Sequence, residues 1–216
     1  MPPFDLQETT KLLSTTRAVR KRLDFNKPVP REVIMECLNI SQQAPTGSNR
    51  QGWRWIVVSD SEKRKALADI YRKGAGDYLV NSEAKAATDG DHQSVRVYSS
   101  AQYLAENLEK APVHVIPLIK TDHMPENPPA RAWAGLMGSI MPAVWSFQLA
   151  LRARGLGSAL TTLHLHHAEN AADLLGIPDK FMQVGLLPVA YTIGTDFKPA
   201  KRPPVENIVY WEQWEE

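Results

Sequence analysis

The chain has a single cysteine among its 216 residues and no marked excess of charge of either sign. One cysteine excludes a disulfide within the chain, which is typical of proteins from a reducing compartment. The formal net charge of +1 excludes a global field that would attract nucleic acid or an anionic membrane surface. Residues 1–10 lack a basic stretch followed by an apolar run, which disfavours a secretory signal. We therefore expect a cytoplasmic protein with no nucleic-acid or membrane partner.

Several short signatures of common enzymes are also missing. The sequence has no G-x-G-x-x-G or G-x-x-x-x-G-K-[ST] loop for phosphates, and no G-x-S-x-G elbow for a nucleophilic serine. His164, His166 and His167 stand close together, but no cysteine or well-spaced acidic residue accompanies them. Because zinc normally needs three or four ligands, we predict no metal site.

A run without charged residues, 132–151, lies between Arg131 and Arg152. The run is long enough to span a bilayer, but it contains glycine, serine, proline and glutamine, so its hydrophobicity is modest. We interpret it as a helix that is apolar all round and is buried in a core or in a subunit interface. A membrane anchor is the alternative interpretation.

The rest of the chain mixes helix and strand patterns. Asp5 with Glu8, and Ser59 with Glu62, form capping boxes, and Pro30 precedes a helical pattern. Within that pattern the only cysteine, at position 37, is interpreted as a small buried side chain rather than a reactive thiol. The expected helices are about 6–13, 30–41, 60–74, 97–108, 132–151 and 168–176, and the expected strands 53–58, 113–119, 156–163 and 184–193.

Three further stretches lack a regular pattern. Residues 74–94 and 121–129 are polar or proline-rich and are predicted to be loops, and residues 194–216 are predicted to form an extended tail. Helices and strands do not alternate regularly, and no repeat or domain break is evident. We therefore predict a single domain over residues 1–216 with an α+β fold.

Three clusters of basic and polar residues, 17–20, 45–51 and 201–203, are candidates for a binding site. Arginine side chains are well shaped to hold a phosphate. Asparagine and glutamine offer both donors and acceptors, which suits a polyol chain and a ring edge. A ligand that combines a phosphate, a polyol and a heterocycle fits the description of FMN.

The chain resembles the nitroreductase family of FMN-dependent oxidoreductases over almost its full length, through five short segments that occur in the family's order. Residues 16–20 (TRAVR) resemble the family's R-R-S-[VI]-R segment. Residues 44–53 (APTGSNRQGW) resemble its A-P-S-x-x-N-x-Q-P-W segment. The segments 155–162 (GLGSALTT), 187–191 (LPVAY) and 201–204 (KRPP) follow in the family's order. Each segment is short, and their common order carries the resemblance.

Three positions depart from the family pattern. Thr16 and Ala18 stand where the family usually has arginine and serine, so one phosphate contact is expected to be weaker or to come from elsewhere. Gly52 replaces a proline and loosens a turn.

The resemblance implies an FMN site made of residues dispersed along the chain. Arg20 is expected at the N1/C2=O edge of the flavin, where a cation stabilises the reduced ring. Residues 161–164 are expected beside the ring, with a backbone N–H near N5. Lys201 or Arg202 would join Arg17 and Ala18 at the phosphate, and His164 is a speculative general acid. The implied site comprises Arg17, Ala18, Arg20, Pro45, Thr46, Gly47, Asn49, Gln51, Thr161, Thr162, Leu163, His164, Lys201 and Arg202.

The resemblance also implies an interlocked homodimer with a central, mostly antiparallel sheet flanked by helices. FMN would lie in two grooves at the interface, with Pro45, Thr46 and Gly47 contributed by the partner subunit and Asn49 bonded to the ring or ribityl chain. The 195–216 tail would wrap the partner and add a strand to its sheet. The 74–94 and 121–130 loops would line the substrate entrance. Tyr78, Tyr98 and His123 are candidates to contact a planar acceptor there, but a surface position without a function is the favoured interpretation for each.

The implied reaction is a ping-pong transfer. NADH or NADPH reduces the flavin at N5, and a nitroaromatic, quinone or similar acceptor then takes its place and is reduced. Two alternatives remain within the fold, namely reductive dehalogenation and flavin fragmentation. A third alternative is a flavin-binding or sequestering protein without turnover. The sequence does not distinguish among the acceptors or between the two nicotinamides.

Overall fold

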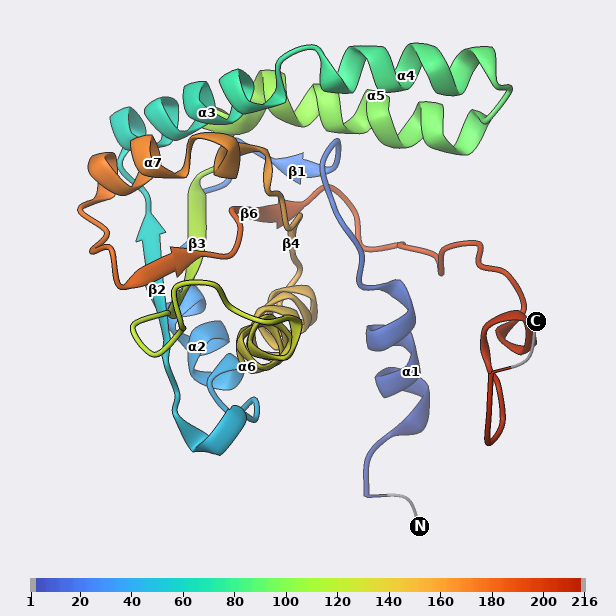
Figure 1. Cartoon of the computed structure of the whole chain (residues 1–216). Coiled ribbons are helices and arrows are strands. Elements are labelled where there is room, and N and C mark those ends of the chain that lie inside the picture. Colours follow the sequence, from blue (N-terminus) through green and yellow to red (C-terminus); the bar gives the residue numbers. More distant parts are fainter. Residues whose placement is uncertain (1–2, 215–216) are drawn as a thin grey trace.

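Strand β3 (Val113–Lys120) lies at the centre of a six-stranded sheet and is buried on both faces. The structure is a computed structural model that describes residues 3–214 (Figure 1). The other strands are β1 (Leu23–Asp24), β2 (Trp53–Val58), β4 (Leu156–Ser158), β5 (Phe181–Gln183) and β6 (Leu187–Thr192). Every pair is antiparallel, in the order β1-β6-β3-β2, with β4 beside β6 and β5 beside β3. The predicted α+β fold with a mostly antiparallel sheet is confirmed.

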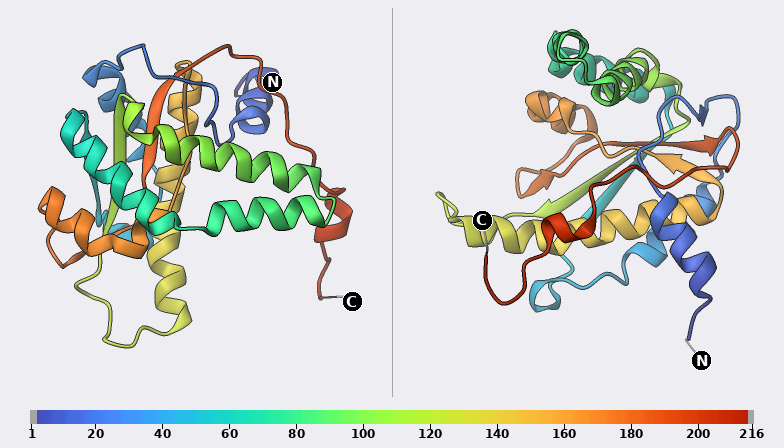
Figure 2. Two further views of the ribbon diagram at one scale, coloured as in Figure 1. Left: turned by 90° about the horizontal axis from the view of Figure 1, so that it is seen from above. Right: turned by 90° about the vertical axis from the view of Figure 1, so that its right-hand side faces the viewer.

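Helices cover both faces of this sheet (Figures 1 and 2). One face carries α2 (Arg31–Ser41) and α6 (Ala130–Ala153), and the other carries α3 (Ser61–Ala75), α5 (His92–Asn107) and α7 (Ala168–Leu175). Helix α4 (Tyr78–Thr88) lies along α5 in a hairpin that extends beyond the sheet, and α1 (Leu6–Thr15) stands to one side. The 3-10 turns are η1 (Gly47–Asn49), η2 (Leu108–Lys110), η3 (Leu163–His167) and η4 (Val205–Ile208).

The side chains of β3 alternate between two cores, because successive residues of a strand point to opposite faces. Ile116 and Leu118 pack in the core under α3 and α5, whereas Val115 and Ile119 pack in the core under α2 and α6. The central strand therefore joins both helical layers to one sheet.

Most helix ends follow the predicted signals. The Asp5 carboxylate accepts a hydrogen bond from the Glu8 N–H at 3.0 Å and caps α1, and Gly176, at φ 65°, closes α7. The cap of α3 is Asp60 rather than Ser59, with the Lys63 N–H donating to its carboxylate at 2.9 Å. A carboxylate at a helix start also interacts favourably with the helix dipole, which the serine would not do.

The predicted loop over 74–94 is wrong, because most of that stretch belongs to helices α4 and α5 and to the end of α3. Gly76 and Gly90 do make turns, with φ of 44° and 70°. Between them the chain is rich in alanine, and Leu79 and Ala86 are buried against α5. The polar residues that suggested a loop form the exposed face of an amphipathic hairpin.

The predicted strand over 156–163 is too long. Strand β4 ends at Ser158, Thr161 makes one bridge with Leu186, and the chain then turns into η3. His164 and His166 therefore lie in a 3-10 turn rather than on one face of a strand. Strand β6 begins three residues later than predicted, and β1 and β5 were not predicted because strands of two or three residues carry too little pattern.

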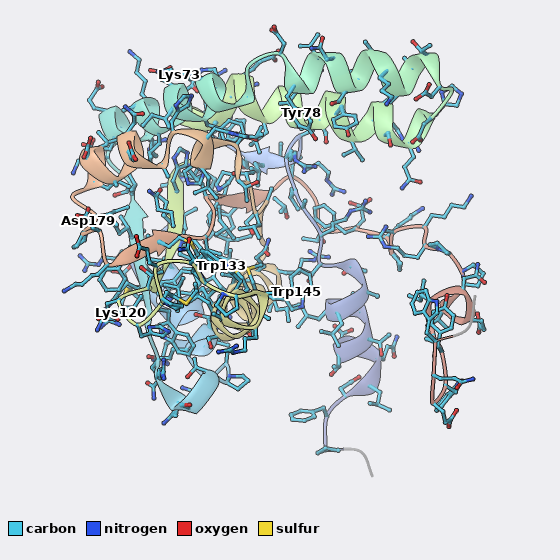
Figure 3. The ribbon with its side chains drawn as sticks, in the orientation of Figure 1. Lys73, Tyr78, Lys120, Trp133, Trp145 and Asp179 are labelled. Atoms are coloured by element: carbon cyan, nitrogen blue, oxygen red, sulfur yellow. The ribbon has the colours of Figure 1, made fainter. Side chains whose placement is uncertain are left out.

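Helix α6 is long and apolar enough to cross a membrane by length and composition, and 44% of its most apolar window is buried inside the protein. Its buried side, with Ile140, Phe147 and Leu151, packs on the sheet, which confirms the prediction of a core helix. Trp133 and Trp145 lie on its other sides and are 41% and 42% exposed (Figure 3). Cys37 is fully buried, as predicted, and burial raises the pKa of its thiol to about 11.

The predicted extended tail is confirmed over the described residues, which have η4 as their only regular element after β6. Residues 215–216 of the predicted tail, and residues 1–2 of the predicted domain, lie outside the described part of the chain. The tail leaves the body beyond β6 and passes below the α4–α5 hairpin (Figure 1).

Candidate functional site

Two of the sequence motifs pack directly on each other. The Val19 N–H donates a hydrogen bond to the Ser158 carbonyl at 2.9 Å. A Cβ at Gly157 would lie only 2.8 Å from Thr192 Cγ2 and 2.9 Å from Val19 Cβ, so this position requires glycine. The close approach holds the arginine segment 17–20 beside the segment that leads into η3.

A groove of two adjoining hollows lies at this junction, and we call it the Arg20 groove. The larger hollow has a volume of about 930 Å³ and the smaller about 410 Å³, and they share Arg20, Gln93 and Val97. The groove brings together eight of the predicted site residues: Arg17, Ala18, Arg20, Thr161, Thr162, Leu163, Lys201 and Arg202.

The Arg20 groove is strongly cationic. No carboxylate of the described residues lines it. Its five basic side chains are Arg17, Arg20, Arg96, Lys201 and Arg202. Arg20 is half-buried in the groove, and its Nη1 donates a hydrogen bond to Ser100 Oγ at 3.3 Å. Burial lowers the pKa of Arg20, but a guanidinium stays charged in a protein. Burial also raises the pKa of the neighbouring Tyr71 to about 12, which keeps that phenol neutral.

The first residues of the tail are fastened to the body next to this groove. Arg22 forms an ion pair with Asp196 at 2.6 Å, and the Phe197 ring lies between the guanidinium groups of Arg22 and Arg152, at 4.2 and 4.7 Å from its centroid. Arg17 donates to the Lys198 carbonyl at 3.1 Å. These contacts bring the two cations of the tail, 201 and 202, to the same groove as Arg17.

The remaining predicted residues of the 45–51 segment do not line the Arg20 groove. They belong to a loop on the α6 side of the sheet, where the Gly47 N–H donates to Ser139 Oγ at 3.1 Å. The Gln51 N–H donates to Thr46 Oγ1 at 3.2 Å, and the Gln51 side-chain amide donates to Asn49 Oδ1 at 3.0 Å. In one chain the structure therefore divides the predicted residues between two places.

His164 is fully buried and its side chain does not line the groove. Burial lowers the pKa of His164 to about 4, so its ring is neutral at neutral pH. The structure thus gives no support to the speculative role of His164 as a general acid. Its neighbour Leu163 does line the groove, and a Cβ at Gly74 of α3 would collide with the Leu163 carbonyl. Helix α3 therefore packs closely against the backbone of this segment.

Several groove residues were missed by the sequence analysis, in part because the first residues of α5 were predicted to be a loop. Gln93, Ser94, Arg96 and Ser100 reach the groove from α5. The rings of Tyr78 and Tyr98, two candidates from the sequence, meet edge to face at 6.2 Å between centroids. The Asp91 carboxylate accepts hydrogen bonds from the Gln93 and Ser94 N–H groups, so an N-cap followed by helical spacing could have revealed α5.

Comparison with known proteins places these features in a family. The model of the nitroreductase family matches residues 13–191. A protein called NADH dehydrogenase from Thermus thermophilus is 26% identical, covering 95% of this chain and 100% of that protein. Iodotyrosine deiodinase 1 from Rattus norvegicus is also 26% identical, covering 94% of this chain and 69% of that protein. A solved structure of oxidized iodotyrosine deiodinase bound to FMN and 3-iodo-L-tyrosine shares the fold, with a TM-score of 0.69, 22% identity, and coverage of 95% of this chain and 99% of that one.

Proposed function

The chain belongs to the nitroreductase family, and we propose that it is an FMN-dependent oxidoreductase that uses NADH or NADPH to reduce a small aromatic acceptor. The observation that carries the proposal is the Arg20 groove, which gathers five cations and the 160–163 segment without a carboxylate. A groove of this charge favours a ligand with a phosphate.

The residues present fit FMN. Arg17, Lys201 and Arg202 would hold the phosphate at the larger hollow, since planar guanidinium groups match phosphate oxygens. Two of these three cations, Lys201 and Arg202, come from the tail. FMN, when bound, supplies the hydride chemistry.

Arg20 and the 161–163 segment would act on the ring. Held by Ser100 and by burial, Arg20 presents a fixed cation to the N1/C2=O edge and stabilises negative charge there without reorganisation. Thr161 is tied to Leu186 by two backbone hydrogen bonds of 2.9 and 2.8 Å, so the backbone beside the ring is rigid. These residues orient and stabilise the cofactor, and no side chain of the groove is assigned a proton transfer.

The cofactor proposal is tested by a spectrum of the purified protein and an anaerobic titration with each nicotinamide. We expect a bound flavin that NADH or NADPH bleaches. Arg20→Gln should keep the flavin but slow its bleaching by roughly a hundredfold, the effect typical of one preorganised donor. The exposed Lys65→Gln, which makes the same change in charge on α3, should have no effect. A yellow protein that neither nicotinamide bleaches would instead favour flavin binding without turnover.

A single groove for both substrates predicts ping-pong kinetics. The chain has no dinucleotide-binding glycine motif, so the nicotinamide and the acceptor would use the same exposed flavin face in turn. Steady-state rates with NAD(P)H and a nitroaromatic or quinone should give parallel double-reciprocal lines. Intersecting lines would contradict the shared site.

We also propose that two such single-domain chains form a dimer whose 45–51 loops complete each other's grooves. Two observations support this arrangement. The loop holds predicted flavin contacts but does not line the groove of its own chain. The tail exposes large apolar side chains, with Ile208, Trp211 and Trp214 70%, 77% and 74% exposed. Exposed apolar patches of this kind mark protein interfaces.

Reductive deiodination is a second candidate function, because both a relative and a solved neighbour are iodotyrosine deiodinases. The Tyr78–Tyr98 pair at the smaller hollow could contact an aromatic substrate. Incubation of the dithionite-reduced protein with 3-iodo-L-tyrosine should release iodide if this function is right. Reoxidation by a nitroaromatic without iodide release would favour the first proposal.

A further inference from the structure

Another hollow, of about 250 Å³, lies apart from the two hollows of the Arg20 groove. Ile119 and Leu136 of the core under α6 form part of its wall, whereas Tyr71 and Leu79 of the opposite core line the Arg20 groove. It opens between the loop 46–52, the loop after β3 and the first turns of α6. These three segments are far apart in sequence, and the fold alone brings them together.

This hollow is lined by four basic residues and by no carboxylate: Arg50, Lys120, His123 and Arg131. Lys120 is neutralised, since it forms an ion pair with Asp122 at 2.6 Å, and His123 lies 3.6 Å from the same carboxylate. Arg50 and Arg131 differ from them. Among residues 3–214, neither guanidinium makes an ion pair or a side-chain hydrogen bond. The hollow therefore has two uncompensated cations at its edge.

The loop that carries Arg50 is held in a conformation that costs free energy. Ser48, Asn49 and Gln51 have φ of 53°, 51° and 48°, in the left-handed region that side chains other than glycine seldom adopt. The loop is fixed to α6 through the hydrogen bond from Gly47 to Ser139. Strain of this kind persists where the surrounding structure holds it and is concentrated at functional sites. Arg50 is thus presented over the start of α6, where Arg131 lies.

We propose that this Arg50–Arg131 pocket binds the oxyanion group of a substrate. The group is a carboxylate on the aromatic acceptor or the 2′-phosphate of NADPH, both of which pair with guanidinium forks. A volume of about 250 Å³ accommodates such a group or one small ring, but not a whole dinucleotide. The inference rests on the proposed function, in which the 45–51 loop completes the partner's groove and so places this charge beside the reacting ring.

The kinetic test compares matched substrates with the FMN-loaded protein and its Arg50→Gln and Arg131→Gln variants. The acceptors are 4-nitrobenzoate and the neutral 4-nitrobenzamide, and the donors are NADPH and NADH. In one of the two pairs, we expect each variant to raise the KM of the member that carries the extra carboxylate or 2′-phosphate by roughly tenfold or more, the loss typical of a hydrogen bond to a charged group. The KM of the member that lacks this group should stay within about twofold. An effect on nitrobenzoate identifies a carboxylate, and an effect on NADPH identifies the dinucleotide phosphate.

Two controls distinguish recognition of the anionic group from a general effect of lost charge or of impaired folding. Lys65 is an exposed cation outside every hollow described above. Lys65→Gln should therefore leave the KM ratio within each substrate pair unchanged. Arg131→Lys should restore part of the preference, because it returns the charge but not the planar fork. Variants that impair both members of each pair equally, or neither, would overturn the proposal.

A binding measurement separates this inference from the proposed function. Calorimetric titration of the FMN-loaded protein with benzoate, and separately with inorganic phosphate, should show binding whose affinity falls by roughly tenfold or more in Arg131→Gln, the loss of one charged contact. Binding that needs the two arginines in a protein that neither nicotinamide reduces would support the pocket and refute the oxidoreductase. Flavin reduction with neither probe bound and no charge preference in the kinetics would refute the pocket alone.

Discussion

The central strand β3 and the C-terminal tail differ sharply in how their apolar side chains are covered. Along β3, residues 113–119 are buried on both faces of the sheet. Along the tail, every described residue from Lys201 onward is exposed, including Tyr210 and Trp214, whose rings stack on each other at 4.3 Å. The strand is satisfied within one chain, whereas the tail presents an apolar surface to solvent. Within one chain, therefore, the core around β3 is fully covered, whereas the apolar side chains of the tail are left exposed.

Helix α6 shows the same difference within a single turn. Phe147 is fully buried and packs with its ring 5.5 Å from that of Trp55, while Trp145 is 42% exposed. Trp145 also lines the larger hollow of the Arg20 groove, next to the tail residues 199–202. One side of α6 therefore stabilises the fold, and another side faces the candidate site.

Removal of the tail after Lys198 should have the largest effect. The truncation keeps the Arg22–Asp196 ion pair but removes the exposed aromatic rings and the two cations proposed to hold the phosphate, Lys201 and Arg202. We expect loss of the dimer and flavin binding weaker by at least about a hundredfold, since contacts to charged groups are worth about 1.5–3 kcal/mol each. Light scattering and flavin absorbance after gel filtration measure the two effects.

A double variant separates the two roles of the tail. Trp211→Ser combined with Trp214→Ser keeps Lys201 and Arg202 but removes two exposed aromatic rings. This double variant should therefore weaken the dimer. A truncated protein that stays dimeric with its flavin would show that the exposed tail has neither role.

Phe147→Ala should lower the free energy of unfolding by about 3–5 kcal/mol, because it leaves a cavity in a closed core. In the flavin-free protein, Trp145→Ala should change it by less than about 0.5 kcal/mol, as is usual for exposed positions. Urea unfolding of both variants measures the difference. Equal losses would contradict the division of α6 into a buried side and a side that faces the site.

The smallest expected effect is a loss of stability at acid pH, which would come from the core and not from the tail. Burial lowers the pKa of both His114 and His164 from 6.5 to about 4. In the unfolded chain both rings bind protons below about pH 6.5, so the stability they contribute is full above that pH and is lost as pH falls toward 4. Between about pH 7 and pH 5 the loss should be on the order of 1–2 kcal/mol per histidine.

Urea unfolding at the two pH values tests this prediction. His164→Gln should remove about half of the pH dependence, whereas His92→Gln on the exposed start of α5 should leave it unchanged. A free energy of unfolding that is the same at both pH values would show that the buried rings are already hydrated.

Much of the fold could be predicted from local pattern. The apolar run of β3, the cap at Asp5 and the uncharged run of α6 each depend on nearby residues, and each prediction is confirmed. Helix α4 and the first residues of α5 were missed because the helical signal of α4 is weak until Leu79 and Ala86 are buried against α5.

The sequence by itself determined the family, through five short segments in a fixed order, and the chemistry of the candidate site, through its arginines and amides. Only the tertiary structure decided where those residues meet. The contact of Gly157 with Val19 gathers eight of them in the Arg20 groove. The hydrogen bond from Gly47 to Ser139 holds the 45–51 loop against α6, near Arg50 and Arg131, whose guanidinium groups make no ion pair among residues 3–214. The physical reason is that residue type and spacing encode local conformation, whereas proximity between distant segments depends on how side chains pack.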